Sequence, residues 1–155
     1  MDTEQLTDAD LAAQPAAYWT GLANEALVAF TRVWLTELGF TQPGYWLLRN
    51  LSKHDLSPDG QGMTLPELEQ AMSSYLRPED DLAIESELLV GRGWLTRDEA
   101  ARLWITEAGE DARAGLKARV PGFRTRVHER IDDADYVTTL KVLRQMLRNT
   151  GRPVD

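Results

Sequence analysis

The stretch Asp55-x-Ser57-x-Asp59-Gly60 has the spacing of the oxygen ligands that begin an EF-hand calcium loop. Such a loop also needs an aliphatic residue at its eighth position and a glutamate at its twelfth, and here those positions hold Gly62 and Pro66. A turn rich in Ser, Asp and Gly explains the stretch better, because such side chains bond to nearby backbone. We therefore expect no metal site in this segment.

The other chemically reactive side chains form no catalytic pattern. Cysteine is absent, which excludes disulfides, thiol nucleophiles and Cys-based zinc sites. His54 and His128 are the two histidines and lie far apart in the sequence. The sequence also lacks a glycine-rich phosphate loop, a nucleophile elbow and His-x-x-x-His spacing. We therefore expect no catalytic residue, no cofactor and no enzymatic activity.

Composition indicates one ordinary globular domain. The 155 residues can bury a real core, and the hydrophobic content of 43% and charged content of 27% are typical of a globular protein. No apolar run is long enough to span a membrane, and the acidic N-terminus does not resemble a signal peptide. These features predict a cytoplasmic protein that does not interact with membranes.

Charge is distributed unevenly along the chain. The formal net charge of −8 argues weakly against nucleic acid, which attracts basic surfaces. Residues 64–112 contain 12 acids and 4 bases, whereas residues 113–155 contain 5 acids and 10 bases. The chain is therefore electrostatically polarised, and its most acidic part lies in the middle.

Helical periodicity and capping residues define the first half of the chain. We expect residues 1–16 to be a flexible arm and the apolar stripe from Tyr18 to Leu38 to form a helix that Gly39 ends. Thr41 should cap a second helix, and residues 52–62 should form a loop. Thr64 and Glu67 form a capping box that predicts a third helix, which extends to about residue 75.

The second half should contain a hairpin between two helices. Pro78 is placed to open a fourth helix, which Gly91 and Gly93 close. Residues 94–97 and 102–106 are then predicted to form the two short strands of a hairpin. Thr106 could cap a long helix, which Pro121-Gly122 should kink or interrupt, and Asp132 or Asp133 could cap a final helix.

This order of elements resembles the MarR family of winged-helix transcriptional regulators. The segments that carry the resemblance are LGFTQPGYWLLRNL (38–51), TLPELEQAM (64–72), GRGWL (91–95) and LWITEAGEDA (103–112). The last segment is similar to the "LTeaG" motif with which the family leaves its wing. The resemblance implies a mainly α fold over residues 17–150, with a winged helix-turn-helix at 41–106 and dimerisation helices at 17–38 and 107–148.

The resemblance further implies a homodimer that binds double-stranded DNA and responds to a small aromatic ligand. Candidate DNA-binding residues are the polar and basic residues around the fourth helix and the wing: Ser73, Ser74, Arg77, Arg92, Arg97 and Arg102. Candidate pocket residues are aromatic and lie on the first two helices: Trp19, Phe30, Trp34, Tyr45 and Trp46. The alternative, that these aromatic residues form helix packing and dimer core, is favoured by their spacing on the helices.

The fourth helix departs from the family pattern. At 100° per residue, Leu82, Ser86, Leu89 and Val90 share a core face. The outer face carries Asp80, Ile84, Glu87 and Leu88, with Asp81 at its edge, where the family commonly has donors for bases and phosphates. Two interpretations stay open. In the first, flanking arginines still bind DNA, although the acidic helix weakens that binding. In the second, Ile84 and Leu88 contact a protein partner, and the protein is an interaction module.

Overall fold

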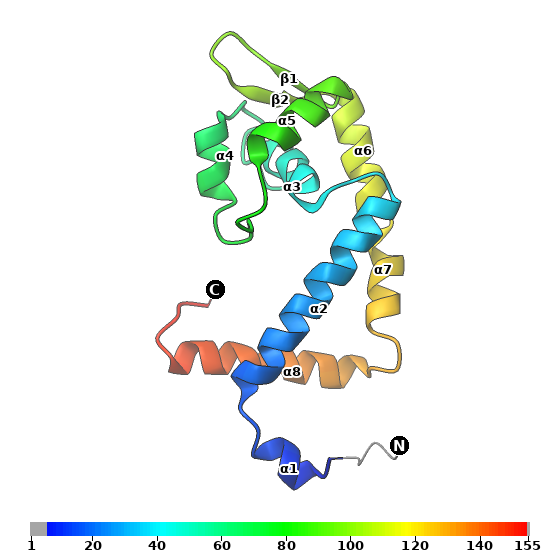
Figure 1. Cartoon of the computed structure of the whole chain (residues 1–155), viewed down its shortest axis with the longest axis vertical. Helices are drawn as coiled ribbons and strands as arrows, with labels where there is room; N and C mark the ends of the chain where they lie inside the picture. The colour runs from blue at the N-terminus through cyan, green and yellow to red at the C-terminus, as the bar shows by residue number, and fades with distance from the viewer. Residues whose placement is uncertain (1–5, 155) are drawn as a thin grey trace. The chain divides into compact units, whose positions relative to one another are not determined.

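The structure is a computed structural model that describes residues 6–154 (Figure 1). It is mainly helical with one two-stranded sheet, and it divides into two compact units, one up to Gly115 and one from Leu116 onward. Between residues 6 and 154, no helix combines the length and apolar character needed to cross a membrane. The predicted mainly α fold with a winged helix-turn-helix is confirmed.

The first unit contains most of the regular structure. In chain order its elements are α1 (Asp8–Ala12), α2 (Ala16–Glu37), α3 (Gln42–Leu51), α4 (Leu65–Ala71), α5 (Leu82–Gly91), β1 (Leu95–Arg97), β2 (Leu103–Ile105) and the start of α6 (Glu107–Lys117). The second unit contains α7 (Val120–Val127) and α8 (Asp133–Asn149). The α1 helix lies in the segment that we predicted to be an arm, of which residues 1–5 are outside the described residues.

Side-chain caps begin α3, α4 and α6 where the sequence predicted them. Thr41 Oγ1 accepts from the Gly44 amide at 3.1 Å and starts α3. The capping box is complete at α4, because the Thr64 amide donates to Glu67 Oε2 at 2.9 Å while the Glu67 amide donates to Thr64 Oγ1. Thr106 Oγ1 accepts from the Gly109 amide at 3.0 Å. Each cap satisfies amides that the first helical turn leaves without partners.

Leucines from three helices and both strands form most of the core of the first unit. The buried cluster consists of Leu47, Leu48, Leu51, Leu68, Met72, Leu82, Leu89, Leu95 and Leu103. The antiparallel strands pair Leu95 with Ile105 and Arg97 with Leu103. Met63 extends this ladder, because its amide and carbonyl both bond to Leu103. The residue before the α4 cap is therefore fastened to the wing, a contact that the sequence did not predict.

Two helix boundaries differ from prediction. The α4 helix ends at Ala71 instead of reaching residue 75, and α5 begins at Leu82 instead of near Pro78. The carboxylate of Asp81 accepts from the amides of Ala83 and Ile84, so this residue is the N-cap. A proline favours a first helical turn but satisfies no amide, whereas Asp81 satisfies two.

In the second unit, the predicted interruption and the final cap are both confirmed. The break falls at residues 118–119, and Pro121 lies in the first turn of α7, where a missing amide hydrogen costs nothing. Asp132 caps α8 through the Ala134 amide. The rings of His128 and Tyr136 lie 4.2 Å apart and hold the end of α7 to the start of α8.

Candidate nucleic-acid interface

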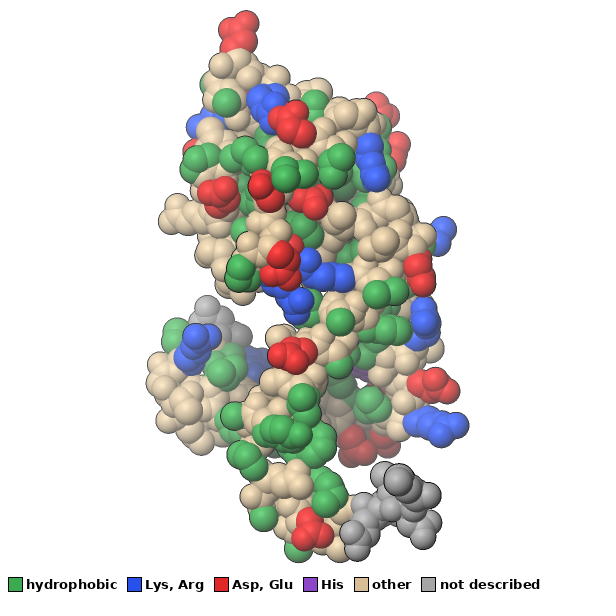
Figure 2. Space-filling view, viewed as in Figure 1, with side chains coloured by type: hydrophobic (Ala, Val, Ile, Leu, Met, Phe, Trp, Pro, Cys, Tyr) green, Lys and Arg blue, Asp and Glu red, His purple; other side chains and the backbone are tan. Residues whose placement is uncertain are grey.

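The α4 and α5 helices form a helix-turn-helix, and α5 presents an apolar outer face. Its inner residues Leu82, Ser86 and Leu89 are buried, as the helical phase predicted. On the other side, Ile84 is 60% exposed and Leu88 is 54% exposed. Figure 2 shows hydrophobic side chains over this part of the molecule with acidic side chains around them. A shallow hollow on this face is lined by Leu65, Ala83, Ile84, Glu87 and Leu88.

Asp80 does not belong to that outer face, and its predicted position was wrong. It lies in the turn before α5, where its side chain is only 5% exposed. Both carboxylate oxygens accept from the Arg32 guanidinium at 2.9 Å, and one also accepts from the Arg77 amide. The hydrogen bonds from Arg32 lower the pKa of the Asp80 carboxyl. The pair joins α2 to the start of α5, so Asp80 is a structural acid.

The other acids near α5 also have defined contacts. Asp81 is occupied as the N-cap, and Glu85 accepts a hydrogen bond from the Thr41 hydroxyl at 2.6 Å. Glu87 forms an ion pair with Arg97 of β1. The carboxylates that were expected to repel phosphate therefore bond to neighbouring groups, and the charge of Glu87 is neutralised by Arg97 of the wing.

The four candidate arginines are engaged inside the chain. Besides the Arg97 pair with Glu87, Arg102 donates to the Gly62 carbonyl at 2.7 Å and to Glu67 at 3.2 Å. Arg77 lies 3.8 Å from Glu79, and Arg92 donates to the Gly39 carbonyl. Side chains of Arg77, Arg97 and Arg102 keep 34% to 40% of their surface exposed. Such partly solvated pairs are weak, so these arginines can exchange partners.

The remaining candidates, Ser73 and Ser74, are exposed in the turn that follows α4. The two serines and Arg77 lie in the segment between α4 and α5, whereas Arg97 and Arg102 lie on the two sides of the turn at the tip of the wing. Arg92 lies at the opposite end of α5, with its guanidinium 5.0 Å from the centre of the Trp94 ring.

Asp98 organises the wing tip, a role that the sequence analysis missed. Its carboxylate accepts from the amides of Ala100 and Arg102 and from the Trp104 indole at 2.9 Å. The Trp104 bond is the largest cause that lowers the pKa of Asp98. Ala101 has φ of 58°, the left-handed conformation that closes the turn. An aspartate at the start of a four-residue turn is the signal that could have predicted this.

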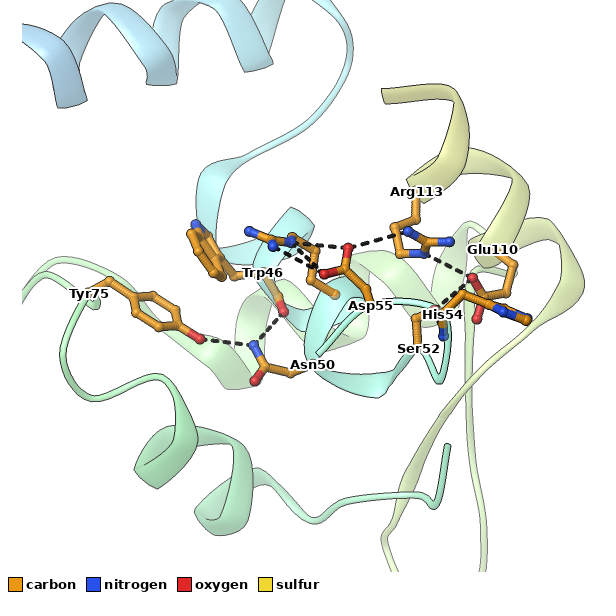
Figure 3. A network of polar contacts seen from close by, with 9 residues as sticks. Trp46, Asn50, Ser52, His54, Asp55, Tyr75, Glu110 and Arg113 are labelled. Carbon is orange, nitrogen blue, oxygen red and sulfur yellow. Dashed lines mark hydrogen bonds and ion pairs between the residues drawn. The ribbon is translucent and has the colours of Figure 1, made fainter. Parts of the chain in front are cut away.

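A buried polar network anchors the inner side of the unit (Figure 3). Asp55 accepts from Arg49 at 3.1 Å and from Arg113 at 3.3 Å, and Arg113 also donates to Glu110 at 2.9 Å. Ser52 donates to the same Glu110 carboxylate. The network ties the loop after α3 to α6. The network also gives the role of Asp55, the first residue of the EF-hand-like stretch, which forms ion pairs with two arginines.

The candidate aromatic pocket residues lie on two helices. Trp19, Phe30 and Trp34 are on α2, with Trp19 46% exposed. Tyr45 and Trp46 are on α3, where the Arg49 guanidinium lies 4.4 Å from the Trp46 ring and Trp46 stacks on Tyr75 at 4.1 Å. A separate small cavity of about 30 Å³ lies beside Phe40, Leu89 and Trp94, which is too small for an aromatic ligand.

Solved structures with this architecture were found, whereas no protein-family model and no curated protein sequence matches the chain. The MarR-family protein Rv2887 of Mycobacterium tuberculosis, in complex with DNA, matches with a TM-score of 0.65 and 20% identity, over 86% of this chain and 98% of that one. The chain has the MarR fold. The reduced form of MarR from E. coli matches with a TM-score of 0.65 and 16% identity, over 91% and 99%. Rv2887 with salicylic acid matches with a TM-score of 0.60 and 23% identity, over 85% and 98%.

The helices and strands of this chain can be compared with the elements of the MarR fold. The predicted order of helices is confirmed, with the β1–β2 hairpin between α5 and α6. In a helix-turn-helix, the second helix is the one that enters the major groove. By position that helix is α5, and the β1–β2 hairpin is the wing.

Proposed function

We propose that this protein is a DNA-binding transcriptional regulator of MarR type, without enzymatic activity, that acts as a homodimer in the cytoplasm. The observation that carries the proposal is the exposed outer face of α5, which stands beside a wing that Asp98 preorganises. A recognition helix must have an unobstructed face to enter the major groove. The match to Rv2887, which was solved with DNA, supports the same assignment.

Electrostatics set the expected character of the binding. Arg77, Arg97 and Arg102 each lie beside a carboxylate, so a phosphate would compete with that carboxylate for the guanidinium. Each phosphate contact by a cation releases counterions, and a phosphate contact that breaks an ion pair gains less. We therefore expect weaker affinity and a shallower salt dependence than a basic winged helix would show.

The homodimer follows from uncovered apolar surface within each unit. On α2, Tyr18 and Val33 are each 58% exposed, and on α8, Val142 is 47% exposed. Helices of this length with apolar faces are stable when another surface covers those faces. A second copy of the chain would supply that surface by two-fold symmetry. Light scattering should give twice the chain mass of 17.5 kDa.

A small aromatic ligand is a further part of the proposal. It is supported by the structure of Rv2887 with salicylic acid and by the aromatic side chains of α2 and α3. Salicylate should quench Trp fluorescence and raise the melting temperature, because a ligand of the folded state stabilises it. Trp34→Phe should weaken the response more than Trp104→Phe, a wing variant. No response at millimolar salicylate would contradict this part alone.

One experiment tests the core of the proposal. Fluorescence anisotropy would measure binding of the protein to a library of genomic duplexes between 50 mM and 200 mM salt. We expect a sequence preference and an affinity that falls with salt. Arg97→Glu with Arg102→Glu should abolish binding, whereas Arg130→Glu, in the turn before α8, should retain it. Absence of binding to every duplex at low salt would contradict the proposal.

A further inference from the structure

The outer face of α5 lacks the groups that usually read bases. The helix sequence, LAIESELLVG, contains no Arg, Lys, Asn or Gln. Its polar side chains already have partners: Glu85 is bonded to Thr41, Ser86 is buried and bonded to the Ala83 carbonyl, and Glu87 is paired with Arg97. The side chains offered to a groove are therefore Ala83, Ile84 and Leu88.

Base edges in the major groove offer one apolar group, the C5 methyl of thymine. A face made of aliphatic side chains can discriminate thymine from the other bases by covering that methyl. It gains nothing comparable from guanine, adenine or cytosine, whose edges need hydrogen-bond donors or acceptors. Glu87 is the exception, because a carboxylate can accept from cytosine N4, but Glu87 would have to exchange its ion pair with Arg97 for that bond.

The positions of the two aliphatic residues match the geometry of the groove. Ile84 is the third residue of α5 and Leu88 the seventh, so both project from the same side of the helix. In a helix-turn-helix, the N-terminal residues of the second helix approach the bases. Four residues advance about 6 Å along a helix, close to two base steps of about 3.4 Å each.

We propose that Ile84 and Leu88 contact the methyl groups of two thymines, about two base steps apart, in each operator half-site. The inference rests on the proposed function and names its specificity. DNA fits this face better than a protein partner does, because the arginines on the wing and before α5 flank the face with cations that phosphate can use.

The test is removal of methyl groups from DNA. A preferred duplex is first selected from random sequences with the full-length protein, and each thymine is then replaced by deoxyuracil, which keeps the base pair and removes only the C5 methyl. Affinity should fall roughly fourfold at each of two positions, the effect of exposing one methyl-sized group. Both positions should lie in the same half-site, about two steps apart.

Variants assign each methyl to a side chain. Ile84→Ala should bind thymine and uracil duplexes equally at one position, and Leu88→Ala should do so at the other. Both residues are exposed, so neither change should alter folding, which circular dichroism and the melting temperature would verify. Leu56→Ala, which removes an exposed leucine from the loop after α3, is the matched control and should keep both preferences.

Distinct results overturn the inference. Equal affinity of the wild-type protein for thymine and uracil duplexes would overturn it while the proposed function stands. Unchanged duplex binding and unchanged discrimination in both variants would also overturn it and would leave the face to a protein partner. If the wild-type protein selects no duplex at low salt, the proposed function fails and the inference fails with it.

Discussion

Acid–arginine pairs lie on both sides of the winged-helix unit, but at different exposure. On the inner side, the side chains of Asp55 and Arg113 are 5% and 7% exposed. On the outer side, those of Glu87 and Arg97 are 63% and 34% exposed. A buried charge that loses its partner stays desolvated, whereas water replaces the partner of an exposed charge. The inner pairs therefore fix the architecture, and the outer pairs can be exchanged.

Removing an inner arginine should have the largest effect. Arg113→Ala deletes the contacts to Asp55 and Glu110 and should cost about 3 kcal/mol of unfolding free energy, the lower part of the range for a broken buried pair, because Arg49 remains beside Asp55. Urea denaturation would measure the loss. Arg97→Ala, the outer counterpart, should cost less than about 1 kcal/mol. Equal costs for the two variants would contradict the comparison.

Two glycines of α6 provide the same contrast between inside and outside. A Cβ on Gly109 would lie 2.2 Å from the Trp94 carbonyl oxygen, whereas one on Gly115 would meet nothing within 4 Å. Gly109→Ala should therefore cost about 2 kcal/mol through overpacking against backbone. Gly115→Ala should gain up to about 1 kcal/mol from helix propensity. Thermal unfolding should move the two melting temperatures in opposite directions, and a shared direction would contradict this.

The Arg32–Asp80 pair should make the free energy of unfolding depend on pH. Because the pKa of Asp80 is lowered in the folded state, its contribution is fully present above the ordinary value of 3.8 and is lost as pH falls through the lowered value. Asp80→Asn should cost about 2 kcal/mol at pH 7 and weaken the acid dependence. Asp81→Asn keeps a capping side chain and should cost little. An unchanged acid profile in Asp80→Asn would contradict the assignment.

Neutralising an outer acid should have the smallest effect. The effect should be on DNA affinity and not on the free energy of unfolding. Glu87→Gln frees Arg97 and should raise affinity roughly threefold at 50 mM salt, since an exposed pair is worth less than about 1 kcal/mol. The gain should shrink at higher salt because ions screen it. Glu25→Gln on α2 makes the same charge change outside the helix-turn-helix and serves as control. A decrease in affinity would show that Glu87 itself contacts the operator.

Local interactions explain why the elements could be predicted. Thr41, Thr64, Thr106 and Asp132 each cap a helix through an amide two or three residues ahead, so the sequence contains both partners. The inner and outer faces of α5 follow from 100° per residue, and the burial of Leu82 and the exposure of Ile84 and Leu88 agree. The error at Pro78 is also local, because two capping signals compete within four residues.

The partners of the charged residues could not be predicted from local sequence signals. Asp80 was assigned to the outer face because periodicity was extended through the turn before α5, and its arginine lies 48 residues away. Asp55 and Arg113 are 58 residues apart. The sequence by itself therefore determined the order of the main helices and strands, most of their starting caps and which of their faces are apolar. Only the tertiary structure decided which acids are paired, because pairing depends on distances between elements that no local periodicity encodes.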